Sequence, residues 1–391
     1  MNIIKIEKIT YIFIPPLIFL ILFYSGITYP PVDFFVYYGA VEEAERNISI
    51  YDKNIYSNYI SDDGLPFVYT PFTLVVLKPL IILPPELSWF FWSLISSFSL
   101  YELLKISGVD KFQSRHILFI LIYGSSIISQ HFVFGQINLI LAALCFYDLT
   151  SSDGRVVPKG FLTGVAAGIK LTPAIFTLYL LINRQYKEFM WSLAGFTASV
   201  VIGFIFYPAS TVSYFGKEIF GLSGKVDLGT NFASSGNNSM SGMLAFFVPN
   251  LNSAYKYIIL LFTLILFFYI AQKLYTVKEL GLSVALVGIC ANIISPVSWI
   301  HHWIFLVVSL VILINFHKFR IFSIISLSIL LVQPTDLGDL LIGSDYFLIN
   351  LIGSIFREYL LILGFAIAIL SFIIERDCNK SLNIPKQECE K

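Results

Sequence analysis

The sequence predicts an all-α membrane protein that crosses the bilayer about twelve times as helices, with short juxtamembrane helices in its first external loop. Hydrophobic residues make up 57% of the 391 positions and charged residues only 13%, whereas a soluble domain carries about 25% charged residues. Residues 11–27 and 189–207 contain no charge, and residues 347–374 contain one Arg–Glu pair. Runs of about 20 apolar residues are long enough to span the hydrocarbon core as helices.

Composition also bears on partners and processing. The formal net charge is zero, which gives no support to a nucleic-acid partner. The first apolar run contains Pro15 and Pro16, and no small-residue cleavage site follows it, so we predict a retained signal anchor. The cysteines, at positions 145, 290, 378 and 389, form no CxxC motif and indicate neither a disulfide framework nor a zinc site.

The orientation is predicted from the basic residues, because short basic loops face the cytoplasm. One path of the chain through the membrane, called the threading below, places all of the basic clusters on the cytoplasmic side. These clusters are Lys5 and Lys8, residues 105–115, 155–159, 184–187, 273–278 and 317–320, and the tail after Glu375. The result is one membrane domain over residues 1–374 and a polar cytoplasmic tail over residues 375–391, disordered from Arg376. This orientation predicts two external loops, residues 29–85 and 208–252. It also predicts three external turns, residues 131–136, 295–302 and 333–345.

The threading sets the expected spans in order. Single spans are predicted at about residues 10–28, 86–104, 116–130, 137–149, 188–207, 253–272, 280–294 and 303–316, and a final hairpin encloses the turn at 333–345. Residues 69–83 are expected to lie along the interface. A full span is the alternative, although Pro71, Lys78 and Pro79 interrupt it. Residues 160–182 form two segments of about 10 residues each, too short to cross unless protein or a cavity shelters their ends.

The threading used only the basic residues, yet the other polar clusters also lie on its external side. The first is Pro30-Pro-Val-Asp33-Phe-Phe-Val-Tyr37-Tyr38. An apolar setting raises the pKa of a carboxylate and makes it a better proton acceptor. Asp also favours helix N-caps, and position alone does not choose between a base and a cap for Asp33.

The second and third clusters surround Gly135 and Lys170. In His131-Phe-Val-Phe-Gly135-Gln136-Ile-Asn138 the glycine allows a tight turn, and the amides either bind substrate or cap the next span. A lysine within an apolar stretch is a functional-site hypothesis, and its natural partner here is a lipid phosphate. Snorkelling to the headgroups is the alternative, and the mid-segment position of Lys170 argues against it.

The fourth cluster is Ser295-Pro-Val-Ser298-Trp299-Ile-His301-His302-Trp303. The tryptophans indicate an interface, and a histidine there can bind phosphate or carry a proton. The long loop adds the Gly-, Ser- and Asn-rich residues 231–241, a composition typical of a flexible or ligand-gripping segment. No Gly-rich phosphate loop is present, so any chemistry would occur outside and use a lipid-carried substrate.

Five of these segments, in this order, resemble glycosyltransferase family 87, whose members are polytopic enzymes of the GT-C class. The segments are residues 33–38, 69–72, 135–139, 164–173 and 295–303, and they cover about residues 30–305. The family usually has Tyr-Pro-Pro where this chain has Tyr69-Thr70-Pro71. We treat that difference as minor drift in the interfacial helix.

The resemblance implies a GT-C architecture, a polyprenyl-phosphate sugar donor, usually mannose, and inversion at the anomeric carbon. Asp33 would be the general base, while Lys170, His302 and His301 would hold the departing phosphate. Substrate contacts are expected from Tyr37, Tyr69, His131, Gln136, Asn138, Asn237 and Ser298.

The expected partners are the donor, a glycolipid or glycan acceptor and membrane lipids. No cofactor or metal is expected, because Lys170 and His302 can neutralise the leaving group and Asp62-Asp63 is not a spaced DxD pair. The rival hypothesis is a transporter or flippase of lipid-linked saccharides. The absence of inverted repeats, and the gathering of polar residues on one face, count against it.

Overall fold

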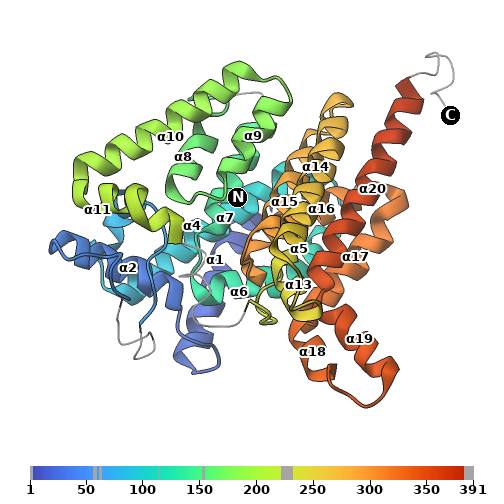
Figure 1. Ribbon diagram of the computed structural model, residues 1–391, viewed down its shortest axis with the longest axis horizontal. Coiled ribbons are helices and arrows are strands. Elements are labelled where there is room, and N and C mark those ends of the chain that lie inside the picture. The colour runs from blue at the N-terminus through green and yellow to red at the C-terminus, as the bar shows by residue number, and fades with distance from the viewer. Residues whose placement is uncertain are drawn as a thin grey trace.

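The computed structural model describes residues 3–55, 60, 64–112, 114–151, 155–221 and 232–382. Over these residues the regular elements are helices, and Ile55 and Leu65 form an isolated antiparallel bridge (Figure 1). The all-α membrane fold predicted from composition is therefore confirmed. The Asp62-Asp63 pair, Asn231, Cys389 and the tail beyond residue 382 lie outside the described residues.

Among the described residues, four helices are long and apolar enough to cross a membrane: α1 (Ile3–Tyr24), α10 (Tyr186–Phe206), α14 (Ser253–Thr276) and α20 (Tyr359–Leu382). Three bent pairs raise the number of spans to as many as seven if each pair is one span. They are α3 (Pro71–Leu77) with α4 (Pro85–Ile106), α5 (Arg115–Gly124) with α6 (Ser126–Phe134), and α17 (Arg320–Ile329) with α18 (Pro334–Leu341).

Shorter apolar helices complete the bundle: α7 (Asn138–Thr150), α15 (Leu280–Ile294), α16 (Ile304–Ile314) and α19 (Phe347–Arg357). The span expected at residues 116–130 is instead two helices, α5 and α6, bent by 58°, and α6 continues to Phe134, into the predicted turn. Two further corrections concern the C-terminal end. The total of about twelve crossings stays a prediction, because length and composition support four to seven.

The first correction concerns residues 347–374, which are not one span. α19 ends at Arg357 and α20 begins at Tyr359. The Arg357 side chain is 5% exposed and donates hydrogen bonds to Asp339 of α18 and to the carbonyl oxygen of Ala233. A buried guanidinium needs such partners, and reaching them requires the chain to turn here. Residues 333–345, which were expected only to lie outside, contain the helix α18.

The second correction concerns the tail. α20 continues as a helix to Leu382, past Arg376, where disorder was predicted to begin. The sequence rule failed because polar residues extend a helix readily once an apolar segment has nucleated it.

α2 (Val32–Glu45) is the juxtamembrane helix of the first loop, and one face of it is fully buried. Gly135, the residue that ends α6, adopts a left-handed conformation with φ of 71°. A Cβ atom at this position would lie 2.5 Å from the Cβ of Phe34 in α2. Glycine therefore lets the α6–α7 turn approach α2 closely, which brings Gln136 beside Asp33.

Residues 71–82 form α3 and the 3-10 turn Lys78–Ile82, which meet α4 at 120°. Their position along the interface stays a prediction. α8 (Phe161–Ile169) and α9 (Ala174–Ile182) have nine residues each, and Lys170 follows α8 directly. α10 shelters this pair, because the backbone of Gly164 approaches the carbonyl group of Ser192 so closely that no Cβ would fit. The short segments thus have the protein cover that they need.

Several of the predicted external segments lie in the same half of the molecule. In Figure 1, α2, α13 (Met240–Phe247), α18 and α19 lie toward the lower end, whereas the α9–α10 turn and the C-terminal end of α20 lie toward the upper end. The threading from basic residues is consistent with this arrangement. Which end faces the cytoplasm stays a prediction.

Candidate active site

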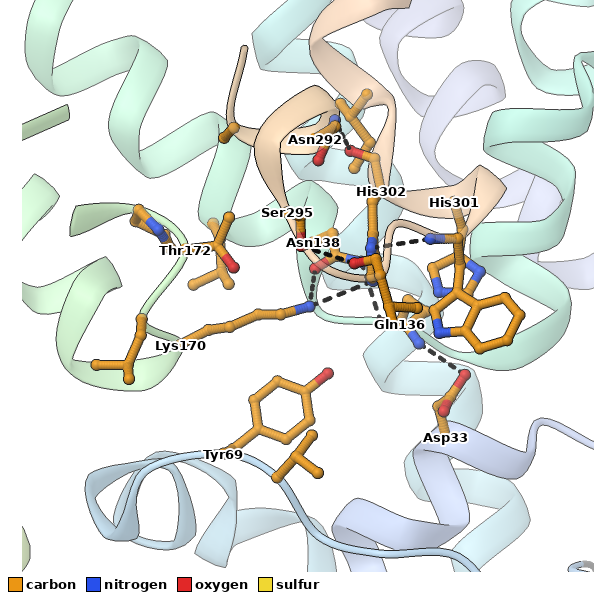
Figure 2. A pocket seen from close by; sticks show the side chains of 18 of the residues that line it. Asp33, Tyr69, Gln136, Asn138, Lys170, Thr172, Asn292, Ser295, His301 and His302 are labelled. Carbon is orange, nitrogen blue, oxygen red and sulfur yellow. Dashed lines mark hydrogen bonds between the residues drawn. The ribbon is translucent and has the colours of Figure 1, made fainter. Parts of the chain in front are cut away.

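A cavity of about 510 Å³ lies between elements that are far apart in the sequence. It is enclosed by α2, residues 65–69, α7, the α8–α9 loop, α15 and residues 295–305. Its polar lining consists of Asp33, Tyr37, Tyr69, Gln136, Asn138, Lys170, Thr172, Asn292, Ser295, His301 and His302, and its deeper wall of apolar residues such as Leu141, Phe176 and Phe305 (Figure 2). A polar end on an apolar pocket suits an amphiphilic ligand.

Asp33 is in the first turn of α2 but does not cap the helix. The capping position is Pro31, and the Asp33 Oδ2 atom instead accepts a 2.6 Å hydrogen bond from Gln136 Nε2. Burial raises the pKa of this carboxyl group to about 6, although the Gln136 bond and the charge of Lys170 act in the opposite direction. The geometry therefore removes the helix-cap alternative and leaves a carboxylate with an elevated proton affinity.

A chain of hydrogen bonds leads from Asp33 across the cavity. Asn138 Nδ2 donates to Gln136 Oε1 at 3.1 Å, and Lys170 Nζ donates to Asn138 Oδ1 at 2.9 Å. A carboxylate only accepts and an ammonium group only donates. Both amides must therefore point their nitrogen toward Asp33 and their oxygen toward Lys170.

Two tyrosines support this chain from the side. The hydroxyl groups of Tyr37 and Tyr69 lie 2.8 Å apart, and the Tyr37 hydroxyl donates to Gln136 Oε1 at 3.3 Å. Lys170 Nζ lies 5.4 Å from the centre of the Tyr69 ring, a cation–π contact. Both tyrosines are thus part of the polar lining, as expected.

Lys170 also lies next to His302, with Nζ 3.5 Å from Nε2. The backbone N–H of Trp299 donates to His302 Nδ1 at 3.2 Å, so the imidazole proton resides on Nε2. Burial, with the charge of Lys170, holds the pKa of His302 well below its usual range. Neutral His302 and Lys170 are then two neighbouring donors that cannot satisfy each other, which suits a shared anionic acceptor.

His301 occupies the cavity wall without joining this network. Its side chain is buried, and neither ring nitrogen has a hydrogen-bond partner among the described residues. Its ring packs edge-on against Phe134 and His302, with centroid distances of 5.6 and 4.8 Å. Burial, reinforced by the charge of Lys170, lowers its pKa to about 3.

Three expected substrate contacts lie behind the wall. His131 is fully buried, and its Nε2 accepts the N–H of Leu139 at 3.0 Å. Asn237 Oδ1 accepts the N–H of Ser298 at 3.0 Å, and Asn237 Nδ2 donates to the carbonyl group of Pro296 at 3.1 Å. None of the three lines the cavity. They hold the segments that carry Gln136 and His302.

Sequence reasoning missed Asn292 and Tyr214, which line the cavity. Asn292 Nδ2 donates to the carbonyl group of His302 at 3.0 Å, and its isolated position within an apolar run was an available signal. Tyr214, in the long loop predicted to be external, had no such signal. In the described part of the chain, no group of three or more His, Cys, Asp and Glu side chains is arranged to hold a metal ion.

The family model described as "Glycosyltransferase family 87" matches residues 67–296 of the sequence, more than half of the chain. A "polyprenol-phosphate-mannose-dependent alpha-(1-2)-phosphatidylinositol pentamannoside mannosyltransferase" of Mycolicibacterium smegmatis is 29% identical over 287 residues, which are 71% of this chain and 67% of that protein. The protein of the same description from Mycobacterium tuberculosis is 29% identical over 295 residues, 73% of this chain and 66% of its own length.

A further M. tuberculosis relative, described as a phosphatidylinositol mannoside mannosyltransferase with the same donor dependence, is 27% identical over 181 residues, 46% of this chain and 41% of its own. The chain thus spans about two-thirds of the length of the first two relatives. No solved structure matches it significantly. Since the family model matches most of the cavity-bearing region, the chain belongs to glycosyltransferase family 87.

Proposed function

We propose that this chain transfers a sugar, with mannose as the expected one, from a polyprenyl-phosphate donor to a hydroxyl group of a glycolipid or glycan at the extracytoplasmic face. One observation carries the proposal. A carboxylate of raised pKa, Asp33, and a pair of phosphate-type donors, Lys170 and His302, lie in one cavity at opposite ends of a hydrogen-bonded chain. The printed descriptions of the relatives, which name this donor and phosphatidylinositol mannoside acceptors, support it.

The reaction needs one base. Gln136 occupies the Oδ2 atom of Asp33, so the Oδ1 atom is available to take the proton of the acceptor hydroxyl. The acceptor oxygen then attacks the anomeric carbon as the bond from that carbon to the phosphate oxygen breaks. Attack opposite a β-linked phosphate inverts the centre and forms an α-linkage. A base with a pKa near 6 is well matched to reaction near neutral pH.

The leaving group needs positive charge. As the glycosidic bond breaks, the phosphate diester becomes a monoester and gains one negative charge. The ammonium group of Lys170 and the Nε2–H of His302 are positioned to stabilise that charge at the moment it develops. The chain through Asn138 and Gln136 keeps this end of the cavity fixed relative to Asp33, as transfer between two bound substrates requires.

The roles of Asp33, His301 and His302 rest on geometry, because these residues lie outside the stretch that the family model matches. The transporter hypothesis has less support. Membership of a glycosyltransferase family favours transfer over transport.

The test is an assay of the purified full chain in lipid with radiolabelled polyprenyl-phosphate mannose, candidate phosphatidylinositol mannosides and glycans, with and without chelator. We expect labelled product with an α-linkage and no effect of the chelator. Matched reactions with a nucleotide-sugar donor control for donor class. Transport of label across the bilayer without any transferred product would overturn the proposal in favour of the transporter.

A further inference from the structure

The two adjacent histidines of the cavity differ in their surroundings. His302 accepts a hydrogen bond from the Trp299 N–H at Nδ1, and its Nε2 lies 3.5 Å from Lys170 Nζ, so that both groups can donate to one anionic acceptor. His301 is 5% exposed and lines the same cavity, yet both of its ring nitrogens lack a hydrogen-bond partner among the described residues. A buried polar group without a partner destabilises the fold, so an unpaired imidazole in a cavity wall is a signal that a ligand supplies the partner.

We propose that His301 binds the acceptor sugar, through a hydroxyl group near the attacking one, and that the donor phosphate is held by Lys170 and His302 without it. This inference rests on the proposed function and divides its substrates between the two histidines. It replaces the expectation that both histidines bind phosphate.

The hydrogen-bonding capacity of His301 supports this division. Burial and the neighbouring charge of Lys170 lower the pKa of His301 to about 3, so the ring is neutral at physiological pH. A neutral imidazole offers one donor and one acceptor nitrogen. A sugar hydroxyl can donate and accept and therefore matches both nitrogens. A phosphate leaving group only accepts hydrogen bonds. It would therefore leave the acceptor nitrogen of His301 without a donor, or place that nitrogen against a phosphate oxyanion.

The arrangement of the cavity points the same way. In Figure 2, Lys170 reaches in from the left, whereas Asp33 and His301 lie on the right. The donor phosphate belongs beside the ammonium group, away from the Asp33 carboxylate, because like charges repel. The attacking hydroxyl belongs beside Asp33, which must take its proton. The acceptor sugar therefore lies on the side of the cavity that His301 lines.

The shape of the His301 environment favours a sugar ring as well. The imidazole is held between Phe134 and His302 by edge-on ring contacts. Trp299 also lines the cavity, and its ring is close enough to Gly236 that a Cβ there would lie 2.4 Å from it. Aromatic walls with a few convergent polar groups are typical of pockets that hold a ligand in one orientation.

The experiment compares the neighbouring variants His301→Ala and His302→Ala in the full chain in lipid. The first measurement is binding of farnesyl phosphate, a short isoprenoid phosphate, by thermal shift. We expect His302→Ala to weaken this binding about ten-fold or more and His301→Ala to change it less than about three-fold. Equal weakening by both variants would overturn the inference, because His301 would then be a phosphate ligand.

The second measurement is transfer kinetics with a phosphatidylinositol mannoside and with octyl α-mannoside as acceptors. His301→Ala should raise the acceptor KM about ten-fold and leave the donor KM nearly unchanged, and His302→Ala should show the reverse. An unchanged acceptor KM in His301→Ala would overturn the inference.

Two further variants separate binding from packing. His301→Asn keeps one donor and one acceptor and should recover part of the acceptor affinity. His301→Phe fills the space without hydrogen bonds and should not. Equal rescue by both would assign His301 a structural role and overturn the inference. A wild-type chain that neither binds farnesyl phosphate nor transfers to any acceptor would overturn the proposed function itself, which is a distinguishable result.

Discussion

Asp33 and Lys170 are the two ends of one hydrogen-bonded chain that runs through the side-chain amides of Gln136 and Asn138. Its bonds measure 2.6, 3.1 and 2.9 Å, and each amide points its nitrogen toward the carboxylate and its oxygen toward the ammonium group. The carboxylate and the ammonium group are therefore fixed at a set separation before any substrate binds. Such preorganisation is what transfer between two substrates needs.

The first prediction concerns the base. Asp33→Asn should lower the rate of transfer by about 10²–10⁴-fold and leave donor binding largely intact. Asparagine keeps the size of the side chain and can still accept the Gln136 bond, so packing should change little. Transfer and donor binding are measured on the same purified sample, with Asp345→Asn at an exposed position as the control. Substantial transfer by the variant would assign Asp33 a structural role.

The second prediction concerns pH. Asp33 must be ionised to act as a base, and its pKa of about 6 means that kcat/KM should rise with pH up to about that value. Lys170, in the loop after α8, must be protonated, and burial lowers its pKa to about 8, so kcat/KM should fall above it. The profile of the free enzyme should therefore be bell-shaped.

A variant checks the assignment of the acidic limb. Gln136→Met removes the hydrogen bond that lowers the pKa of Asp33, so the limb should move to higher pH. Lys170→Arg should instead move the alkaline limb upward, because arginine stays protonated. If the apparent pKa of the acidic limb is unchanged in Gln136→Met, a group other than Asp33 controls that limb.

The third prediction concerns the phosphate site. Lys170→Ala and His302→Ala should each lower kcat/KM for the donor by about 10²–10³-fold, as expected for the loss of a group that stabilises developing charge. Asn292→Ala is the graded control, because it removes only the bond that holds the His302 carbonyl and should have a smaller effect. Near-normal donor KM and kcat in both Lys170→Ala and His302→Ala would refute the assignment.

The fourth prediction concerns the junction of α19 and α20. The Arg357 guanidinium is buried, bonds to Asp339 and to the carbonyl oxygen of Ala233, and lies 3.7 Å from the centre of the Phe246 ring. Arg357→Ala should lower the free energy of unfolding by about 1–3 kcal/mol, because the buried carbonyl loses its donor. Thermal denaturation in detergent measures the effect.

An exposed ion pair is the matched control for this variant. Lys318 and Asp377 lie 3.4 Å apart, and their side chains are 63% and 55% exposed. Lys318→Ala should therefore change stability by less than about 1 kcal/mol. Equal effects of the two substitutions would show that burial of Arg357 contributes nothing.

The fifth prediction concerns topology. Asn250, in the loop predicted to be external, and Lys278, in a loop predicted to be cytoplasmic, are both exposed. In a background without native cysteines, an impermeant thiol reagent applied to intact cells should label Asn250→Cys and not Lys278→Cys. Both should be labelled after permeabilisation. The reverse pattern would invert the threading and place the cavity at the cytoplasmic face.

The sequence by itself determined the class of protein and the segments that build the site. Apolar composition over about 20 residues is a local property, and lipid leaves the backbone of such a run no common alternative to a helix. Asp33, Gln136, Asn138, Lys170 and His302 were recognisable because polar side chains within apolar surroundings are costly and seldom present without a role.

Only the tertiary structure decided how these residues divide the work. It placed Asn237 and Ser298 behind the wall, gave His302 two neighbours and left His301 unpaired within the described chain. It also broke the run at residues 347–374, because Arg357 reaches the carbonyl group of Ala233, 124 positions away. Such contacts depend on packing between distant segments, and a side chain's own neighbours in the sequence carry no information about them.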